Sequence, residues 1–300
     1  MEDKEAQSNI ILNHKRHRKS LVVNIDITQI LPIISDAAKE IVSTILVGLI
    51  AWFKDSIYEK LFLLHSRIKV KMSGKPLILI WNDSDIEISE TLSDHLRNML
   101  PHYRFVPINT PKDILRYPRN PKFVAAVMFI VTDVTKLSED ENIRRKIQEW
   151  LKVYVRNGGA FIGTHDIIYR RTRNEILQSM FGYTVNDFQR VDKVLYVKNK
   201  ELKNSIIFKD LPDEFYLSDG EVIWGVLKQK SMTEIPFYSK SEDARVNGKP
   251  LVLLRKLGDG RLVWLNSADK KEEVAASVSK PEELFIVLLR NCLLWAMDVE

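Results

Sequence analysis

The fold is indicated most directly by residues 154–166, which read Tyr154-Val155-Arg156-Asn157-Gly158-Gly159-Ala160-Phe161-Ile162-Gly163-Thr164-His165-Asp166. The glycine pair is typical of the end of a helix, and the apolar run after it predicts a short strand, Ala160–Gly163. A residue on a strand-to-helix turn projects into the cleft above a sheet, so we expect His165 at such an elbow. There the imidazole is a candidate general base, metal ligand or hydrogen-bond donor to a substrate, or a structural cap for the next segment.

Strands and helices alternate around this stretch. Short apolar runs predict strands at Pro76–Trp81, Tyr103–Ile108 and Phe123–Thr132, and apolar periodicity predicts helices at Ile86–Leu100 and at Ser138–Arg156, the latter with a capping box starting at Ser138. This alternation predicts an α/β fold with a doubly wound, mostly parallel sheet flanked by helices. Ligands of such sheets bind at the carboxyl ends of the strands, here Asn82-Asp83-Ser84-Asp85, Thr132-Asp133 and Thr164-His165-Asp166.

The second half of the chain is richer in strands. We expect them at Lys193–Lys198, Ser205–Phe208, Glu221–Gly225 and Ile235–Tyr238, followed by a hairpin of Leu251–Arg255 with Arg261–Leu265 and a closing helix, Glu282–Met297. The hairpin is predicted because its turn carries the glycines of Gly258-Asp259-Gly260.

Composition limits the possible classes of protein. The 300 residues are 45% hydrophobic and 28% charged, as expected for a soluble globular chain. The single cysteine, Cys292, excludes a disulfide framework, a thiolate zinc cluster and an iron–sulfur site, and it fits a reducing compartment. No secretory signal peptide is evident. We therefore expect a cytoplasmic protein, with peripheral attachment to a membrane as an alternative.

Positive charge is concentrated near the start of the chain. Residues 1–75 contain 12 Lys and Arg against 8 Asp and Glu, and the densest part is His14-Lys15-Arg16-His17-Arg18-Lys19. Residues 14–19 are either a solvated basic arm or a contact for phosphate groups, such as those of an anionic membrane surface. The rest of the chain is nearly neutral, so no specific nucleic-acid binding is predicted.

A long apolar helix is predicted over residues 27–64. Its first half is amphipathic, but Ile41–Phe53 is uncharged and apolar nearly all round, so it must be covered by protein or lipid. These 13 residues are fewer than the roughly 20 that span a bilayer. We therefore expect homo-oligomerisation through residues 27–64, or packing on the main domain, with interfacial membrane anchoring as the alternative. The predicted organisation is a basic arm and short strand (1–26), this helix and a linker (27–72), and an α/β domain (73–300).

Several motifs together resemble a known family. Residues 154–166 are similar to the pattern "YV-x-x-GG-x-x-x-G-x-H-[SD]" of the ThuA-like (trehalose-utilisation) proteins, in the class I glutamine-amidotransferase-like superfamily. Later segments resemble further blocks of that family in the same order, namely 205–212, 215–221, Gly258–Trp264 and Leu288–Met297. The resemblance covers about residues 76–298 and implies a flavodoxin-like sheet and a sugar-like or other small polar substrate.

The chain departs from the resemblance at the positions of the expected chemistry. Class I amidotransferases place a nucleophilic cysteine at the elbow, whereas this chain has His165 there and its cysteine in the terminal helix. The Gly-His that ThuA-like proteins tend to carry after the "GRV" strand is replaced by Leu265-Asn266-Ser267-Ala268, and the usual histidine after the first strand is absent. Glutamine hydrolysis by a thiolate is thus excluded unless another residue supplies the nucleophile.

Three functional hypotheses follow. The first is a degenerate amidotransferase-like domain, a pseudoenzyme that binds a ligand or serves assembly and is presented by the N-terminal helix. The second is a ThuA-like enzyme in which His165 is the acid or base, assisted by Asp219 and Glu221. The third is a membrane-associated effector or scaffold acting through residues 1–65. Candidate ligand-binding residues are Asn82, Asp83, Thr164, Asp166, Arg170 and Arg171. The sequence predicts no metal site and no cofactor.

Overall fold

The structure is a computed structural model that describes residues 43, 74–131, 136–202, 205–218, 220–228, 230–267 and 283–299. Most of the predictions for residues 1–72 fall outside the described residues, as do those for Thr132, Asp133 and Asp219. Among the described residues, no helix has the length and apolar character needed to cross a membrane.

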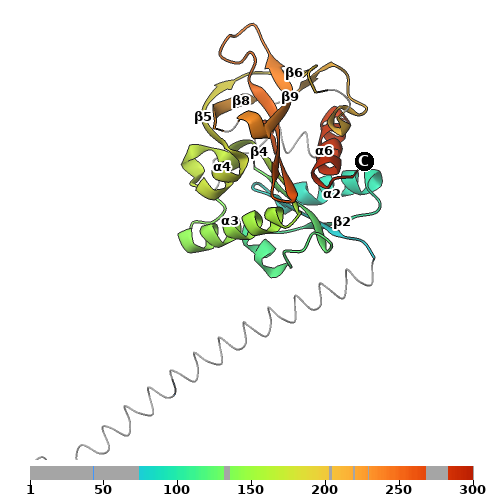
Figure 1. Cartoon of the computed structure of the whole chain (residues 1–300), viewed down its shortest axis with the longest axis vertical. Coiled ribbons are helices and arrows are strands. Elements are labelled where there is room, and N and C mark those ends of the chain that lie inside the picture. Colours follow the sequence, from blue (N-terminus) through green and yellow to red (C-terminus); the bar gives the residue numbers. More distant parts are fainter. Residues whose placement is uncertain are drawn as a thin grey trace, which may run out of the picture. The chain divides into compact units, whose positions relative to one another are not determined.

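A nine-stranded mixed sheet organises the domain (Figure 1). Its first part is parallel, in the order β2 (Arg104–Pro107), β1 (Leu77–Asn82), β3 (Val124–Ile130), β4 (Ala160–Thr164) and β11 (Gly260–Leu265). The sheet continues antiparallel through β10 (Pro250–Leu257), β9 (Thr233–Lys240), β6 (Val194–Lys198) and β7 (Glu214–Leu217). The predicted α/β class is confirmed, and the second half extends the same sheet.

Helices cover both faces of the sheet because its central strands are apolar on both sides. The side chains of Ile78 and Ile80 join a core that includes α2 (Ile86–Met99) and α6 (Glu283–Ala296). Those of Leu77 and Leu79 join a second core with α3 (Glu141–Arg156) and α4 (Glu175–Phe181). In Figure 1 the two pairs of helices lie on opposite sides of the sheet.

The start of α3 differs from the prediction. The N-cap is Asp140 and not Ser138, because the Asp140 carboxylate accepts hydrogen bonds from the backbone N–H of Asn142 and of Ile143, at 2.8 and 3.2 Å. The Ser138 carbonyl instead accepts a bond from the Arg144 guanidinium at 2.9 Å. The helix therefore begins at Glu141, where free backbone donors are first satisfied.

The second half holds one wrong strand prediction and two strands that were not predicted. Residues Ser205–Phe208 form a 3₁₀ turn, η4 (Ile206–Phe208), because the Phe208 N–H closes on the Ser205 carbonyl at 3.0 Å. The strands β5 (Tyr183–Arg190) and β7 were not predicted. β5 pairs with β8 (Glu221–Leu227) in a separate two-stranded sheet. The predicted β10–β11 hairpin is confirmed. Short 3₁₀ segments complete the described elements, η1 (Pro111–Arg116), η2 (His165–Ile168), η3 (Arg170–Thr172) and η5 (Lys230–Met232).

Candidate functional site at the carboxyl edge

The candidate site lies where β1, β3, β4 and β11 end, because these strands are parallel neighbours. Their last residues are Asn82, Ile130, Thr164 and Leu265, and Leu265 is paired in register with Thr164. The chain segments that follow β1, β4 and β11 therefore emerge at one edge of the sheet. This is the crevice position at which open α/β sheets bind ligands.

Thr164 holds two strand ends together. Its hydroxyl donates a hydrogen bond to the Val131 carbonyl at 2.9 Å and accepts one from the Val131 N–H at 2.7 Å. The side chain is fully buried. Thr164 thus fixes the end of β4 against the residue after β3, and its hydroxyl is used in that contact. A role of Thr164 in ligand binding stays a prediction.

Asn82 has a similar positioning role at the end of β1. Its amide donates to the Ile130 carbonyl at 3.2 Å, and its side-chain oxygen accepts from the N–H groups of Ser84 and Asp85, at 2.8 and 3.2 Å. Asp85 in turn caps α2 by accepting from the Glu87 N–H at 3.1 Å. The predicted binding loop 82–85 is therefore a built turn that starts the helix, and Asp83 lies in it, half-buried. Ligand contacts by Asn82 and Asp83 stay predictions.

His165 occupies the elbow with a left-handed backbone conformation, φ +38°. A non-glycine residue rarely adopts this region, and here the next residues turn at once into η2. Its carbonyl accepts a hydrogen bond from the Trp264 indole at 2.9 Å, and its Nδ1 lies 3.5 Å from the Asp166 carboxylate. The side chain is 1% exposed. The elbow is thus present as predicted, but its ring is buried and does not lie open to solvent.

The other predicted site residues are distributed more widely. Asp166 is buried beside His165, and Arg170 and Arg171 are exposed on η3, with the Arg171 guanidinium 5.8 Å from the centre of the Tyr169 ring. Glu221 begins β8 in the two-stranded sheet, opposite Arg190. The structure therefore places His165 and Asp166 together, at the end of β4, and Glu221 in the two-stranded sheet.

Asn266 is a residue at this edge whose role the sequence did not reveal. Its side-chain oxygen accepts from the Ile223 N–H at 3.1 Å, and its amide donates to the carbonyls of Ile223 at 2.7 Å and Pro250 at 3.2 Å. The side chain is fully buried. Asn266 therefore attaches β8, and with it the segment starting at Glu221, to the end of β11. The one sequence signal for Asn266 was its position, since the family resemblance expects a Gly-His pair there.

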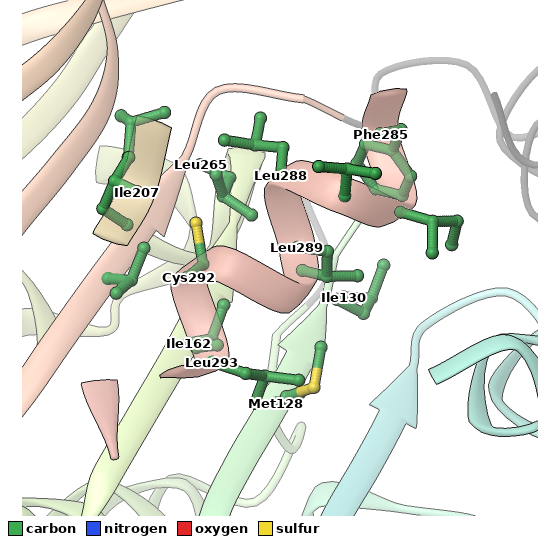
Figure 2. Packing of buried hydrophobic residues seen from close by; sticks show 14 of the residues in the cluster. Met128, Ile130, Ile162, Ile207, Leu265, Phe285, Leu288, Leu289, Cys292 and Leu293 are labelled. Atoms are coloured by element: carbon green, nitrogen blue, oxygen red, sulfur yellow. The ribbon is translucent and has the colours of Figure 1, made fainter. Parts of the chain in front are cut away.

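The chain's cysteine lies inside the protein core. Cys292 belongs to α6 and is fully buried, and Figure 2 shows it among Ile162, Leu265 and Leu288. Burial raises the pKa of the Cys292 thiol well above its usual range. A thiol in such surroundings is neutral and a poor nucleophile. Among the described residues, no group of three or more His, Cys, Asp or Glu side chains is arranged to hold a metal ion.

Comparison with known proteins shows the fold. No protein-family model and no curated protein matches the chain. A solved structure of a cytoplasmic protein from Salmonella typhimurium LT2 is similar at 12% identity and a TM-score of 0.53, over 73% of this chain and 99% of that one. A putative ThuA-like protein from Parabacteroides merdae ATCC 43184 is similar at 14% identity and a TM-score of 0.51, over 74% of this chain and 90% of that one. The α/β fold is therefore shared with a ThuA-like protein at low identity.

Proposed function

We propose that the α/β domain is a cysteine-independent relative of the amidotransferase-like fold that binds a small polar ligand at the carboxyl edge. The observation that carries the proposal is the position of Cys292. The chain's single thiol is fully buried in α6, whereas the elbow holds His165 with the left-handed backbone that such an elbow needs. The framework of the site is kept while the thiolate is absent from it, which favours binding over glutamine hydrolysis.

Charge at the edge supports a polar or anionic ligand. Arg170 and Arg171 are exposed just after the elbow, and guanidinium groups recognise carboxylates and phosphates through paired hydrogen bonds. Thr164, Asn82 and Asn266 hold the strand ends in place by buried hydrogen bonds. A binding site on such a fixed frame is already organised before the ligand arrives. Acid–base chemistry by His165 stays a prediction, since its ring is buried.

The proposal is tested on the thiol itself. In the folded full-length chain, Cys292 is expected to resist alkylation by iodoacetamide over hours and to react readily in guanidinium chloride, because only unfolding exposes it. Ammonia release from glutamine is expected at the background rate. Intact-mass spectrometry and an ammonia assay measure the two results.

A Cys292→Ala chain is the control, since it gives no adduct under either condition. Rapid labelling of the folded protein, or ammonia release that the Cys292→Ala substitution abolishes, would contradict the proposal.

We further propose that the segment 27–64 presents this domain by self-association. The support is the apolar stripe of its sequence, in which Ile41 and Ile45 lie one turn apart. Full-length protein carrying Ile41→Lys and Ile45→Lys is expected to shift to a lower mass in light scattering, because two charges would be buried in the interface. Ser43→Lys, on the polar face of the predicted helix, is the matched control.

An unchanged mass of the double variant, or a monomeric parent chain, would overturn the self-association. If the parent chain is a monomer that binds anionic vesicles, and the double variant Ile41→Lys and Ile45→Lys does not bind them, the result would favour the alternative. That alternative is a membrane-associated effector acting through residues 1–65.

A further inference from the structure

A pocket of about 640 Å³ lies between α3 and the segment that includes η1. From α3 its lining includes Arg145, Lys146, Glu149 and Trp150, and from the facing segment Leu115 and Arg119. None of the residues that line it belongs to the carboxyl-edge site described above. The volume is within the range of small-molecule sites, about 300–1,000 Å³.

The floor of the pocket is rigid. The Trp150 indole is 2% exposed, donates a hydrogen bond to the Tyr117 carbonyl at 3.3 Å, and stacks on Tyr154 with ring centres 5.0 Å apart. Ile114 of η1 is fully buried next to this contact in the same core. The distance between α3 and η1 is thereby fixed. The pocket thus lies over a packed part of the core, although most of its other lining side chains are on the surface.

Three cations surround the opening without anionic partners in the described part of the chain. Arg119, Arg145 and Lys146 are exposed, and no salt bridge or side-chain hydrogen bond within that part involves them. Arg116, on the neighbouring 3₁₀ segment, is by contrast paired with Asp113 at 3.2 Å. Glu149 lies three and four residues from Lys146 and Arg145, a spacing that favours ion pairs, yet it pairs with neither.

We propose that this pocket binds a small, multiply charged anion of the phosphate-ester class. Two guanidinium groups can each form paired hydrogen bonds with phosphate oxygens, and the Lys146 ammonium adds a third positive charge. The lining carries a net charge of +2, since three cations face the single carboxylate of Glu149. A concave site over an apolar floor concentrates this field. We propose a soluble ligand rather than a lipid head group, since the cations lie around a concave site between two elements and not on a flat face.

The test uses the full-length chain and inorganic tripolyphosphate as the probe, at constant ionic strength in a titration calorimeter. Arg145→Gln combined with Lys146→Gln is expected to weaken the affinity at least about tenfold, because two of the three cations are removed. The matched control is Lys152→Gln combined with Arg156→Gln. It makes the same change of charge on the same helix but at positions outside the pocket, and we expect a change of less than about twofold.

Several results would overturn the proposal. One is that the pocket variant binds tripolyphosphate with unchanged affinity. Another is that the pocket variant and its control lose affinity equally, and the third is that the parent chain does not bind tripolyphosphate. Pocket-dependent binding only to vesicles containing a phosphatidylinositol bisphosphate would exclude the soluble ligand in favour of a lipid. Circular dichroism of both double variants shows whether they are folded. The reactivity of Cys292 is unaffected by these changes, so the carboxyl-edge proposal stands or falls separately.

Discussion

Gly260→Ala is expected to destabilise the domain by about 4 kcal/mol or more, a loss that few single substitutions cause. A Cβ atom at Gly260 would lie 2.0 Å from the Val155 carbonyl oxygen and 2.3 Å from that of Gly159. Both are backbone atoms, at the end of α3 and just before β4, so no side chain can rotate away to make room. Because domains are stable by only about 5–15 kcal/mol, the variant is expected to unfold at much lower urea concentration or to accumulate as aggregate.

Gly248→Ala provides the control, because at Gly248 a glycine is favoured by the backbone conformation and not by close packing. Gly248 has a left-handed backbone, φ +73°, and a Cβ atom there would have no atom within 4 Å apart from those of Gly248 and its two chain neighbours. Its substitution is expected to cost about 1 kcal/mol through backbone strain alone. Urea unfolding followed by circular dichroism compares the two variants. Equal losses of stability would show that close packing is not what Gly260 provides.

The same contact explains why two glycine-rich motifs occur about a hundred residues apart. The turn before β11 packs on the loop between α3 and β4, where the Asp259 N–H donates to the Arg156 carbonyl at 3.1 Å and the Arg261 N–H to that of Gly159 at 3.2 Å. A Cβ atom at Gly258 would also lie 2.6 Å from the Arg156 carbonyl oxygen. Two of the motifs that carry the family resemblance are therefore one packing unit, which aligns β11 with β4 and needs no catalytic explanation.

The central parallel strands β1, β3, β4 and β11 were predictable because they are buried on both faces. Runs such as residues 77–81 and Val124–Ile130 are continuously apolar, and the helices between them are amphipathic. The β5 strand was not predictable in this way. It reads Tyr-Thr-Val-Asn-Asp-Phe-Gln-Arg, exposes much of its second half, and is held by pairing with β8, some forty residues later. Its structure depends on a distant partner and not on its own pattern.

The candidate site was predictable in place but not in the roles of its residues. The rule that ligands bind at carboxyl ends of parallel strands selected Asn82 and Thr164, and both do lie at that edge. Their side chains, however, bond to the backbone of Ile130 and Val131, 48 and 33 residues away. No local pattern contains such a contact. Asn266 shows the same limit, since a buried amide that joins three strands reads in the sequence as an ordinary polar residue after a strand.

Asn266→Asp is expected to destabilise the domain by several kcal/mol at neutral pH. The substitution removes the amide donors to the Ile223 and Pro250 carbonyls, and each buried group left unpaired costs about 1–3 kcal/mol. It also introduces a carboxylate at a fully buried position, which is unfavourable when charged. With β8 released from the end of β11, the start of β8 at Glu221 would lose its attachment to the carboxyl edge.

The pH dependence separates these two contributions. Burial raises the pKa of the introduced carboxyl above the value of about 3.9 that it has in the unfolded chain. Below that value the group is neutral in both states, so only the missing hydrogen bonds reduce stability. As pH rises toward the folded-state pKa, the unfolded chain ionises first, and stability falls by about 1.4 kcal/mol per pH unit relative to the parent.

Urea unfolding from pH 5 to pH 7 should therefore show that the difference in unfolding free energy between the parent and Asn266→Asp widens by about 2.7 kcal/mol. Asn186→Asp makes the same chemical change at an exposed position of β5. Its unfolding free energy is expected to stay within about 0.5 kcal/mol of the parent's at every pH. If the difference in unfolding free energy between the parent and Asn266→Asp does not change with pH, water reaches position 266 at the carboxyl edge of the sheet. Asn266 would then be a solvated part of the binding crevice and not the buried joint between β8 and β11.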